Sequence, residues 1–264
     1  MDLQLTDKTA LVTGSTAGIG LAIATALARE GAVVHVNGRS EERVSAAIER
    51  IKADVPGAKV IGIALDLGTA AGAAELARRL PQVEILVNNL GIFEPKAFEQ
   101  IDDGQWLRMF EVNVMSGVRL GRTYLPKMLQ RKWGRIVFIS SESGLQIPVE
   151  MIHYGMTKTA QLAVARGMAE LTMGTGVTVN SVLPGPTMSE GVGDFVSAMA
   201  RHQNKPAGEV ERDFFRTVRP TSLIQRFATP EEVASMVVYV CSPLASATNG
   251  AALRCDGGVV RAIA

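Results

Sequence analysis

The sequence predicts a doubly wound parallel α/β fold with a central sheet of about seven strands. Short apolar runs alternate with longer amphipathic segments along the 264 residues. Such alternation is typical of a parallel sheet covered by helices on both faces. No linker, repeat or low-complexity stretch divides the chain, and 47% of its residues are hydrophobic, enough for a core on both faces. We therefore expect one domain over residues 1–264.

The expected elements follow one another in a regular order. Apolar runs predict strands at 9–13, 32–36, 59–65, 84–87, 135–139, 177–182 and 251–254. The segments between them predict helices at 21–30, 41–53, 70–80 and 230–241, a helical region at 102–131 and a long helix from 148 to about 173. Gly31 is expected to end the first helix, Ser40 to cap the second and Pro81 to stop the third. Thr229 and Pro230 are a good start for the last one.

The regular alternation breaks between Met188 and about Phe227. A segment of this length after the carboxyl end of a strand is typical of a lid. We expect a helical substrate lid at 188–227. Its apolar residues are Val192, Phe195, Met199, Phe214, Phe215 and Leu223, and its basic residues are Arg201, Lys205, Arg212, Arg216 and Arg219.

Composition argues against several classes of partner. The net charge is +1 with interspersed signs, so neither nucleic acid nor a polybasic contact with a membrane is expected. Residues 1–8 lack a signal-peptide core and no apolar run reaches ~18 residues, so we expect a soluble cytoplasmic protein. Cys241 and Cys255 are expected to be free thiols. The histidines at 35, 153 and 202 have no ligand spacing, so no metal site is predicted.

Tyr154 and Lys158 lie four residues apart near the start of the long helix. This spacing puts both side chains on one face, one turn apart. A free tyrosine ionises at about pH 10, and an ammonium ~5 Å away is worth roughly 3 kcal/mol, or about two pKa units. The pair is a candidate acid/base, although the same spacing is a common chance event.

Ser141 comes just after the apolar run 135–139. The carboxyl ends of strands are where ligands of open parallel sheets bind, so its hydroxyl is a candidate partner for a substrate oxygen. A turn or capping role is the alternative.

A glycine-rich loop, Gly14 to Gly20, joins the first strand to the first helix. Gly14 permits the tight turn, Gly18 the approach of a pyrophosphate, and Gly20 close packing of helix on strand. Farther on, an acidic residue after the second strand would select NAD, but the chain has Gly38 and Arg39 there. A guanidinium suits a 2′-phosphate, so NADP(H) is predicted over NAD(H), with a solvated arginine as the alternative.

Together these motifs resemble the short-chain dehydrogenase/reductase family in its single-domain form. The resemblance spans essentially the whole chain and includes Thr13 to Gly20, Asp66-Leu67, Asn88-Asn89-Leu90-Gly91, Asn113, Ser141, Tyr154-x-x-x-Lys158 and Pro184-Gly185. It implies a Rossmann-type NAD(P)-binding domain and an oxidoreductase that acts on CH–OH groups. Sequences of this type often resemble 3-oxoacyl-[acyl-carrier-protein] reductases.

The resemblance also implies residue roles. Tyr154 would exchange the proton with the substrate, Lys158 would depress the phenol's pKa and hold the nicotinamide ribose, Ser141 would polarise the carbonyl, and Asn113 would position a relay water. Cofactor contacts are implied for Gly14, Ser15, Gly18, Ile19, Gly20, Asp66, Leu67, Asn88 and Gly91. Pro184, Gly185 and Thr187 are implied at the carboxamide.

Four residues qualify this assignment. Leu90 replaces a usually small residue. Glu142 and Ser143 follow the catalytic serine, where such enzymes line the substrate pocket, and Glu142 either recognises a polar substrate or points into solvent. His153 is expected to pack rather than to catalyse.

The substrate class stays open between alternatives. A 3-oxoacyl thioester or related 3-oxo compound is slightly favoured, because the lid offers apolar side chains for an acyl chain and basic ones for an acidic carrier. A sugar, polyol or other small hydroxy compound is the alternative, since an acyl pocket is not expected to bury the Glu142 carboxylate. An NADP(H)-sensing regulatory protein is the non-enzyme alternative. Surplus apolar surface on the helix 156–173 predicts a further packing partner. The resemblance implies that this partner is another copy of the chain, in a homotetramer or homodimer.

Overall fold

The computed structural model describes residues 1–203 and 205–263. Within residues 190–203 it describes the side chains of 190–193, 197, 200 and 201. The side chains of Phe195, Met199 and His202, which the sequence analysis named, lie outside the described residues.

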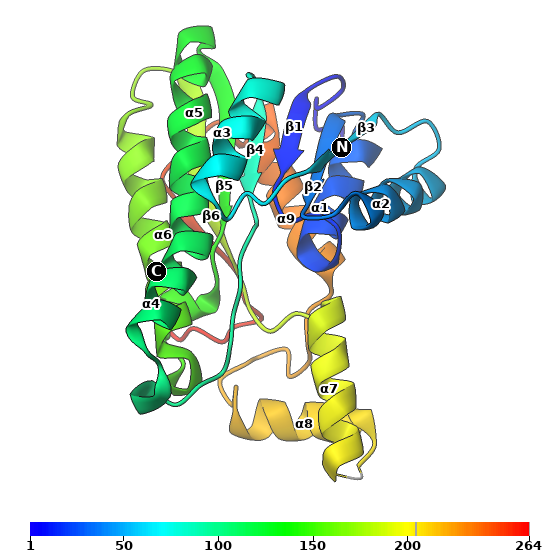
Figure 1. Cartoon of the computed structure of the whole chain (residues 1–264), viewed down its shortest axis with the longest axis vertical. Coiled ribbons are helices and arrows are strands. Elements are labelled where there is room, and N and C mark those ends of the chain that lie inside the picture. Colours follow the sequence, from blue (N-terminus) through cyan, green and yellow to red (C-terminus); the bar gives the residue numbers. More distant parts are fainter. Residues whose placement is uncertain (204, 264) are drawn as a thin grey trace.

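A parallel seven-stranded sheet forms the centre of the described chain, with helices on both faces (Figure 1). Its order, β3-β2-β1-β4-β5-β6-β7, reverses between β1 and β4, which confirms the predicted doubly wound class. Ligands of open α/β sheets bind beyond the strand carboxyl ends at such a switch point. The strands are β1 (Thr9–Val12), β2 (Val33–Gly38), β3 (Val60–Ala64), β4 (Ile85–Asn88), β5 (Trp133–Ile139), β6 (Gly176–Pro184) and β7 (Ala252–Cys255).

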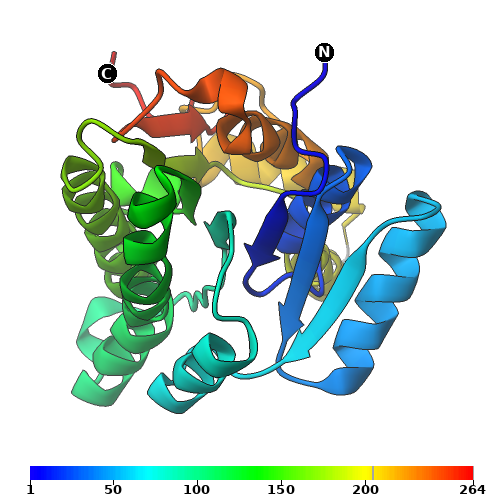
Figure 2. The same ribbon diagram turned by 90° about the horizontal axis from the view of Figure 1, so that it is seen from above.

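Two apolar clusters fill the space between the sheet and its helices. Helices α1, α2 and α9 pack on one face, and α3, α5 and α6 pack on the other (Figure 2). Successive strand residues alternate between them, with Ala10 and Val12 in one cluster and Leu11 in the other. The strands read as continuous apolar runs because both faces are buried. The helices are α1 (Gly18–Arg29), α2 (Glu41–Asp54), α3 (Ala70–Arg79), α4 (Asp103–Phe110), α5 (Ser116–Arg131), α6 (Ile152–Glu170), α7 (Glu190–Gln203), α8 (Ala207–Thr217) and α9 (Pro230–Cys241).

Local chemistry sets several helix ends as the sequence predicted. The Ser40 hydroxyl accepts a hydrogen bond from the Arg43 amide at the start of α2. Gly31 follows α1 with φ of 81°, a left-handed conformation that favours glycine. Thr229 begins α9 with a capping box to Glu232.

The helical region predicted at 102–131 is divided in two. A π-helical turn, Glu111–Met115, joins α4 to α5 and carries Asn113. The irregular turn therefore lies at Asn113, inside a region that was predicted to be helical. π-Turns inside helices are frequent at functional sites.

The segment 188–227 contains α7 and α8, which project from one end of the fold (Figure 1). Phe214, Phe215 and Phe227 lie with ring centroids 5.0–5.1 Å apart. Val210 packs in the same cluster. The segment thus has a small apolar core of its own.

Candidate active site

The candidate catalytic residues come from three elements at the carboxyl end of β5. Ser141 follows that strand, Tyr154 and Lys158 lie on α6, and Asn113 lies on the π-turn. The Lys158 ammonium is 5.5 Å from the centroid of the Tyr154 ring. The Asn113 amide donates to Thr157 Oγ1 of α6 at 3.0 Å, which joins the π-turn to the helix. The structure therefore brings the four side chains to one place.

Lys158 is buried and held by two acceptors. Its Nζ donates to the Ile139 carbonyl at 2.9 Å and to Gln161 Oε1 at 3.2 Å. Burial lowers the pKa of Lys158 to about 8, although the nearby Glu142 opposes the shift. An ammonium has three protons, so one is left to face a ligand.

The pKa of Tyr154 differs from the sequence expectation. The residue as a whole is half-buried, but its phenol end is enclosed, and this burial raises the pKa. Glu142 raises it further, while the Ser141 hydroxyl and the Arg219 guanidinium lower it. Lys158 was expected to lower the phenol pKa by itself, but burial outweighs such contributions because it disfavours the anion.

Gln161 links two of the candidate residues, and the sequence analysis missed it. Its Nε2 donates to the Asn113 carbonyl at 2.6 Å while its Oε1 accepts from Lys158. The relay water that the resemblance places at Asn113 stays a prediction. The spacing of three residues after Lys158, on the same helix face, was the available signal.

The glycine loop has the features that a pyrophosphate needs. Gly14 and Gly18 have φ of 60° and 54°. A Cβ at Gly20 would overlap the Asn89 amide and the Gly14 carbonyl. Ala17 gives α1 no side-chain cap, and the first turn holds no acid, so its N–H groups can receive an anion. These residues fit the diphosphate of a dinucleotide.

Two asparagine side chains to which the sequence analysis gave no role hold this loop. The Asn37 oxygen accepts from the Gly14 amide at 3.1 Å. Asn89 donates to the carbonyls of Thr13 and Gly14 at 2.9 Å each. Asn88, predicted to line the cleft, is buried, and its amide atoms have no hydrogen-bond partner within the described residues. A Cβ at Gly117 would lie 3.5 Å from the Asn88 Cγ, so the side chain packs toward α5.

The remaining predicted cofactor residues lie at the same strand ends. Ser15 is buried and accepts from the Asn37 amide, and Ile19 lies on the first turn of α1. Arg39 and Asp66 are exposed after β2 and β3, and Leu67 is buried. Gly91 borders the catalytic group, since a Cβ there would be 3.5 Å from both Asn113 Oδ1 and Lys158 Nζ. Pro184 ends β6, Gly185 contacts the backbone of Asp256, and the Thr187 hydroxyl donates to the Gly185 carbonyl at 2.9 Å.

Glu142 is buried beside Ser141, so the solvent alternative was wrong. Its carboxylate accepts from the Ser141 hydroxyl and from the Ser143 hydroxyl and amide. The Nε of Arg219, which lies just after α8, donates to Glu142 Oε1 at 3.1 Å. Arg219 Nη1 also donates to Glu150 Oε1 at 2.9 Å. Arg219, expected to meet an acidic carrier, is instead buried in ion pairs.

His153 is fully buried in the described structure and its ring lies edge-on to Trp106, with centroids 5.8 Å apart. Burial lowers its pKa. This environment agrees with the packing role that was predicted.

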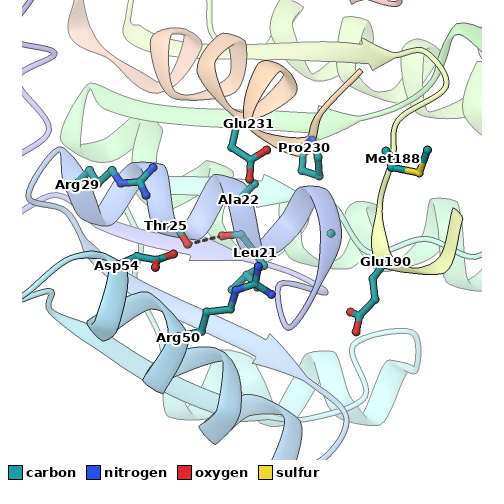
Figure 3. Close-up of a pocket in the computed structure, with 11 residues that line it drawn as sticks. Leu21, Ala22, Thr25, Arg29, Arg50, Asp54, Met188, Glu190, Pro230 and Glu231 are labelled. Carbon is teal, nitrogen blue, oxygen red and sulfur yellow. Dashed lines mark hydrogen bonds between the residues drawn. The ribbon is translucent and has the colours of Figure 1, made fainter. Parts of the chain in front are cut away.

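A pocket of about 410 Å³ lies over the outer side of α1 (Figure 3). Residues of α1, α2, α9 and the segment after β6 line it, among them Thr25, Arg50, Glu190 and Glu231. It borders the glycine loop at Gly18 but contains none of the candidate catalytic residues.

The described residues contain no cluster of three or more His, Cys, Asp or Glu that could hold a metal ion. No helix among them has the length and apolar character to span a membrane. Cys241 and Cys255 are free thiols.

Comparisons with known proteins give a consistent family. Residues 8–199 match the family model described as short chain dehydrogenase. The uncharacterized oxidoreductase YvaG of Bacillus subtilis is 52% identical over 263 residues, covering 100% of both chains. A D-beta-hydroxybutyrate dehydrogenase of Cupriavidus necator is 34% identical, covering 97% of this chain and 99% of its own. The 3-oxoacyl-[acyl-carrier-protein] reductase FabG of Aquifex aeolicus is 32% identical, covering 98% of this chain and 100% of its own, which confirms the resemblance found in the sequence.

Among solved structures, the L-sorbose reductase of Gluconobacter frateurii, complexed with NADPH and L-sorbose, has a TM-score of 0.92. It is 28% identical, and the match covers 100% of both chains.

Proposed function

Because the chain belongs to the short-chain dehydrogenase family and is an oxidoreductase of hydroxyl and carbonyl groups, we propose that it transfers hydride between NADP(H) and a small polar carbonyl/alcohol pair. The observation that carries this proposal is the convergence of Ser141, Tyr154 and Lys158 beside the glycine loop. A regulatory protein that only senses the cofactor would need the loop but not this acid/base group.

Each catalytic residue has a role that its surroundings support. Tyr154 donates the proton to the substrate oxygen during reduction, and its raised pKa keeps the phenol protonated until negative charge develops there. The Ser141 hydroxyl, which donates to the Glu142 carboxylate in this structure, turns to donate to the same oxygen when the substrate binds. Lys158, held by Ile139 and Gln161, directs its remaining proton toward the nicotinamide ribose. The nicotinamide supplies the hydride when it is bound.

NADP(H) is favoured over NAD(H) by the residues after β2. Gly38 leaves no acidic group there, and a Cβ at that position would lie 2.5 Å from the Thr16 methyl. The exposed Arg39 is available to a 2′-phosphate. Fluorescence titration with NADPH and NADH tests this choice, and equal affinities would contradict it.

A sugar, polyol or similar hydroxylated compound is the substrate class that the geometry favours. Glu142 is buried next to Ser141, and Arg219 faces it. Phe215 is buried in the lid's own core and does not offer apolar cover for an acyl chain. A 3-oxoacyl or related 3-oxo compound is the second candidate, favoured by the similarity to the 3-oxoacyl-carrier-protein and hydroxybutyrate enzymes.

Tyr154→Phe is the decisive variant for the mechanism. It removes the transferable proton and should lower turnover by about 10²–10⁴-fold while NADPH still binds. Tyr239→Phe, at an exposed tyrosine on α9, is the matched control and should leave turnover and NADPH binding unchanged. Full turnover in the Tyr154 variant would contradict the proposed acid.

We also propose that the chain forms a homotetramer or homodimer through α6 and the α4–α5 region. Leu107 on α4 and Leu171 and Met173 just beyond α6 are exposed apolar residues. Light scattering at micromolar concentration tests this, and a monomer would contradict it. A cytoplasmic location stays a prediction.

A further inference from the structure

Three charged residues form a set beside the catalytic serine, which we call the substrate charge set: Glu142, Glu150 and Arg219. Arg219 contacts both carboxylates, through Nε to Glu142 and through Nη1 to Glu150. The side chains of Glu142 and Arg219 are only 6% and 10% exposed, and that of Glu150 is 37% exposed. Two carboxylates against one guanidinium leave a formal charge of −1.

Every described contact of the Glu142 carboxylate comes from a donor. Oε2 accepts from the Ser141 hydroxyl and from the Ser143 amide and hydroxyl, and Oε1 accepts from Arg219. This environment suits an ionised carboxylate, which can only accept. Its charge acts on the reacting groups, because it influences the ionisation of both Tyr154 and Lys158.

The set still has unused hydrogen-bonding capacity. Arg219 Nη2 has no partner among the residues that the structure describes, while Nε and Nη1 are engaged. Glu142 Oε1 accepts one described hydrogen bond and has room for another. A free donor and a free acceptor next to each other match a hydroxyl group, which donates and accepts at once. A further carboxylate could use only the donor, and it would meet the net negative charge.

We propose that the substrate charge set selects an uncharged, hydroxylated carbonyl compound and disfavours an anionic one. This inference rests on the proposed oxidoreductase function and adds the charge of the substrate to it. The carbonyl lies at Ser141 and Tyr154, and a neighbouring hydroxyl of the substrate lies between Glu142 Oε1 and Arg219 Nη2. Lys158 Nζ donates to the Ile139 carbonyl and to Gln161, and it makes no described hydrogen bond to a member of the set.

The test compares neutral and anionic substrates that share a carbonyl. NADPH oxidation is measured with methyl acetoacetate against acetoacetate, and with L-sorbose against 5-keto-D-gluconate. We expect kcat/KM to be roughly tenfold or more higher for the neutral member of each pair. Glu150→Gln removes one charge without touching Ser141 and should shrink both ratios several-fold. Glu49→Gln, on an exposed position of α2, removes the same charge elsewhere and should leave both ratios unchanged.

The inference is overturned if the native protein has an equal or higher kcat/KM for the anionic substrates. It is also overturned if Glu150→Gln leaves the neutral-to-anionic ratios of kcat/KM unchanged. A binding measurement separates this outcome from failure of the proposed function. With NADPH present and ionic strength matched, D-sorbitol should raise the melting temperature more than D-gluconate does. If no carbonyl compound is turned over, the proposed function fails. The comparison of the two shifts in melting temperature still decides whether the protein selects by charge.

Discussion

Replacing Arg219 by glutamine should destabilise the protein strongly, because it leaves the buried Glu142 carboxylate without its cation. The two side chains are 10% and 6% exposed, and their N–O distance is 3.1 Å. Two charges about 4 Å apart at an effective dielectric near 20 interact by about 4 kcal/mol. Removing one partner of a buried pair typically costs about 3–5 kcal/mol, so we expect a loss of this order in the free energy of unfolding.

Urea unfolding is the suitable assay, since urea does not screen charges as guanidinium does. Glu142→Gln combined with Arg219→Gln should recover much of the loss, because no unpaired charge stays buried. Arg226→Gln is the matched control. Arg226 contacts Glu232 at 2.7–2.8 Å, closer than the Arg219 pair, but the two side chains are 49% and 44% exposed. Its loss should matter far less, because water screens an exposed pair. If Arg219→Gln costs no more than Arg226→Gln, or the double variant is no better than Arg219→Gln alone, the reasoning about burial is wrong.

Three further predictions concern the cofactor site and the catalytic lysine. Gly38→Asp alone should weaken NADPH and NADH binding alike, because the new side chain overlaps Thr16. Only Gly38→Asp combined with Thr16→Gly should shift the cofactor preference to NADH in fluorescence titrations. Gly20→Ala should lower NADPH affinity at least about tenfold by displacing the loop, whereas Gly167→Ala, with no atom near its Cβ, should raise stability by up to about 1 kcal/mol. Burial lowers the pKa of Lys158 from 10.5 to about 8, so between these values the unfolded chain binds more protons than the folded one. The stability of the native protein relative to Lys158→Met should therefore rise with pH across this window, by about 3 kcal/mol in urea unfolding, and a flat difference would mean that Lys158 has an ordinary pKa.

The order of the strands and helices follows from the sequence because it depends on short-range patterns. Apolar runs, glycines with positive φ and helix caps act within a few residues, so the strand and helix positions agree with the structure to within a few residues at most ends. The Tyr154–Lys158 pair is also local, since four residues on a helix fix which face both side chains share. The helix boundary before Tyr154 was less accurate, because two short 3₁₀ turns, Glu142–Gly144 and Val149–Met151, precede α6.

The tertiary structure decided the contacts between residues far apart in the chain. Arg219 meets Glu142 across 77 residues, and Asn89 holds Gly14 across 75. No local pattern marks such partners, since they depend on how the segment 188–227 folds back and how β1 and β4 become neighbours at the switch point. Those same long-range contacts decide that Glu142 faces the active site and not the solvent. They also decide that burial, and not a nearby ammonium, sets the pKa of Tyr154. The sequence determined which chemical groups the protein has at the strand ends, and the packing of distant segments determined the charge and solvent exposure under which they act.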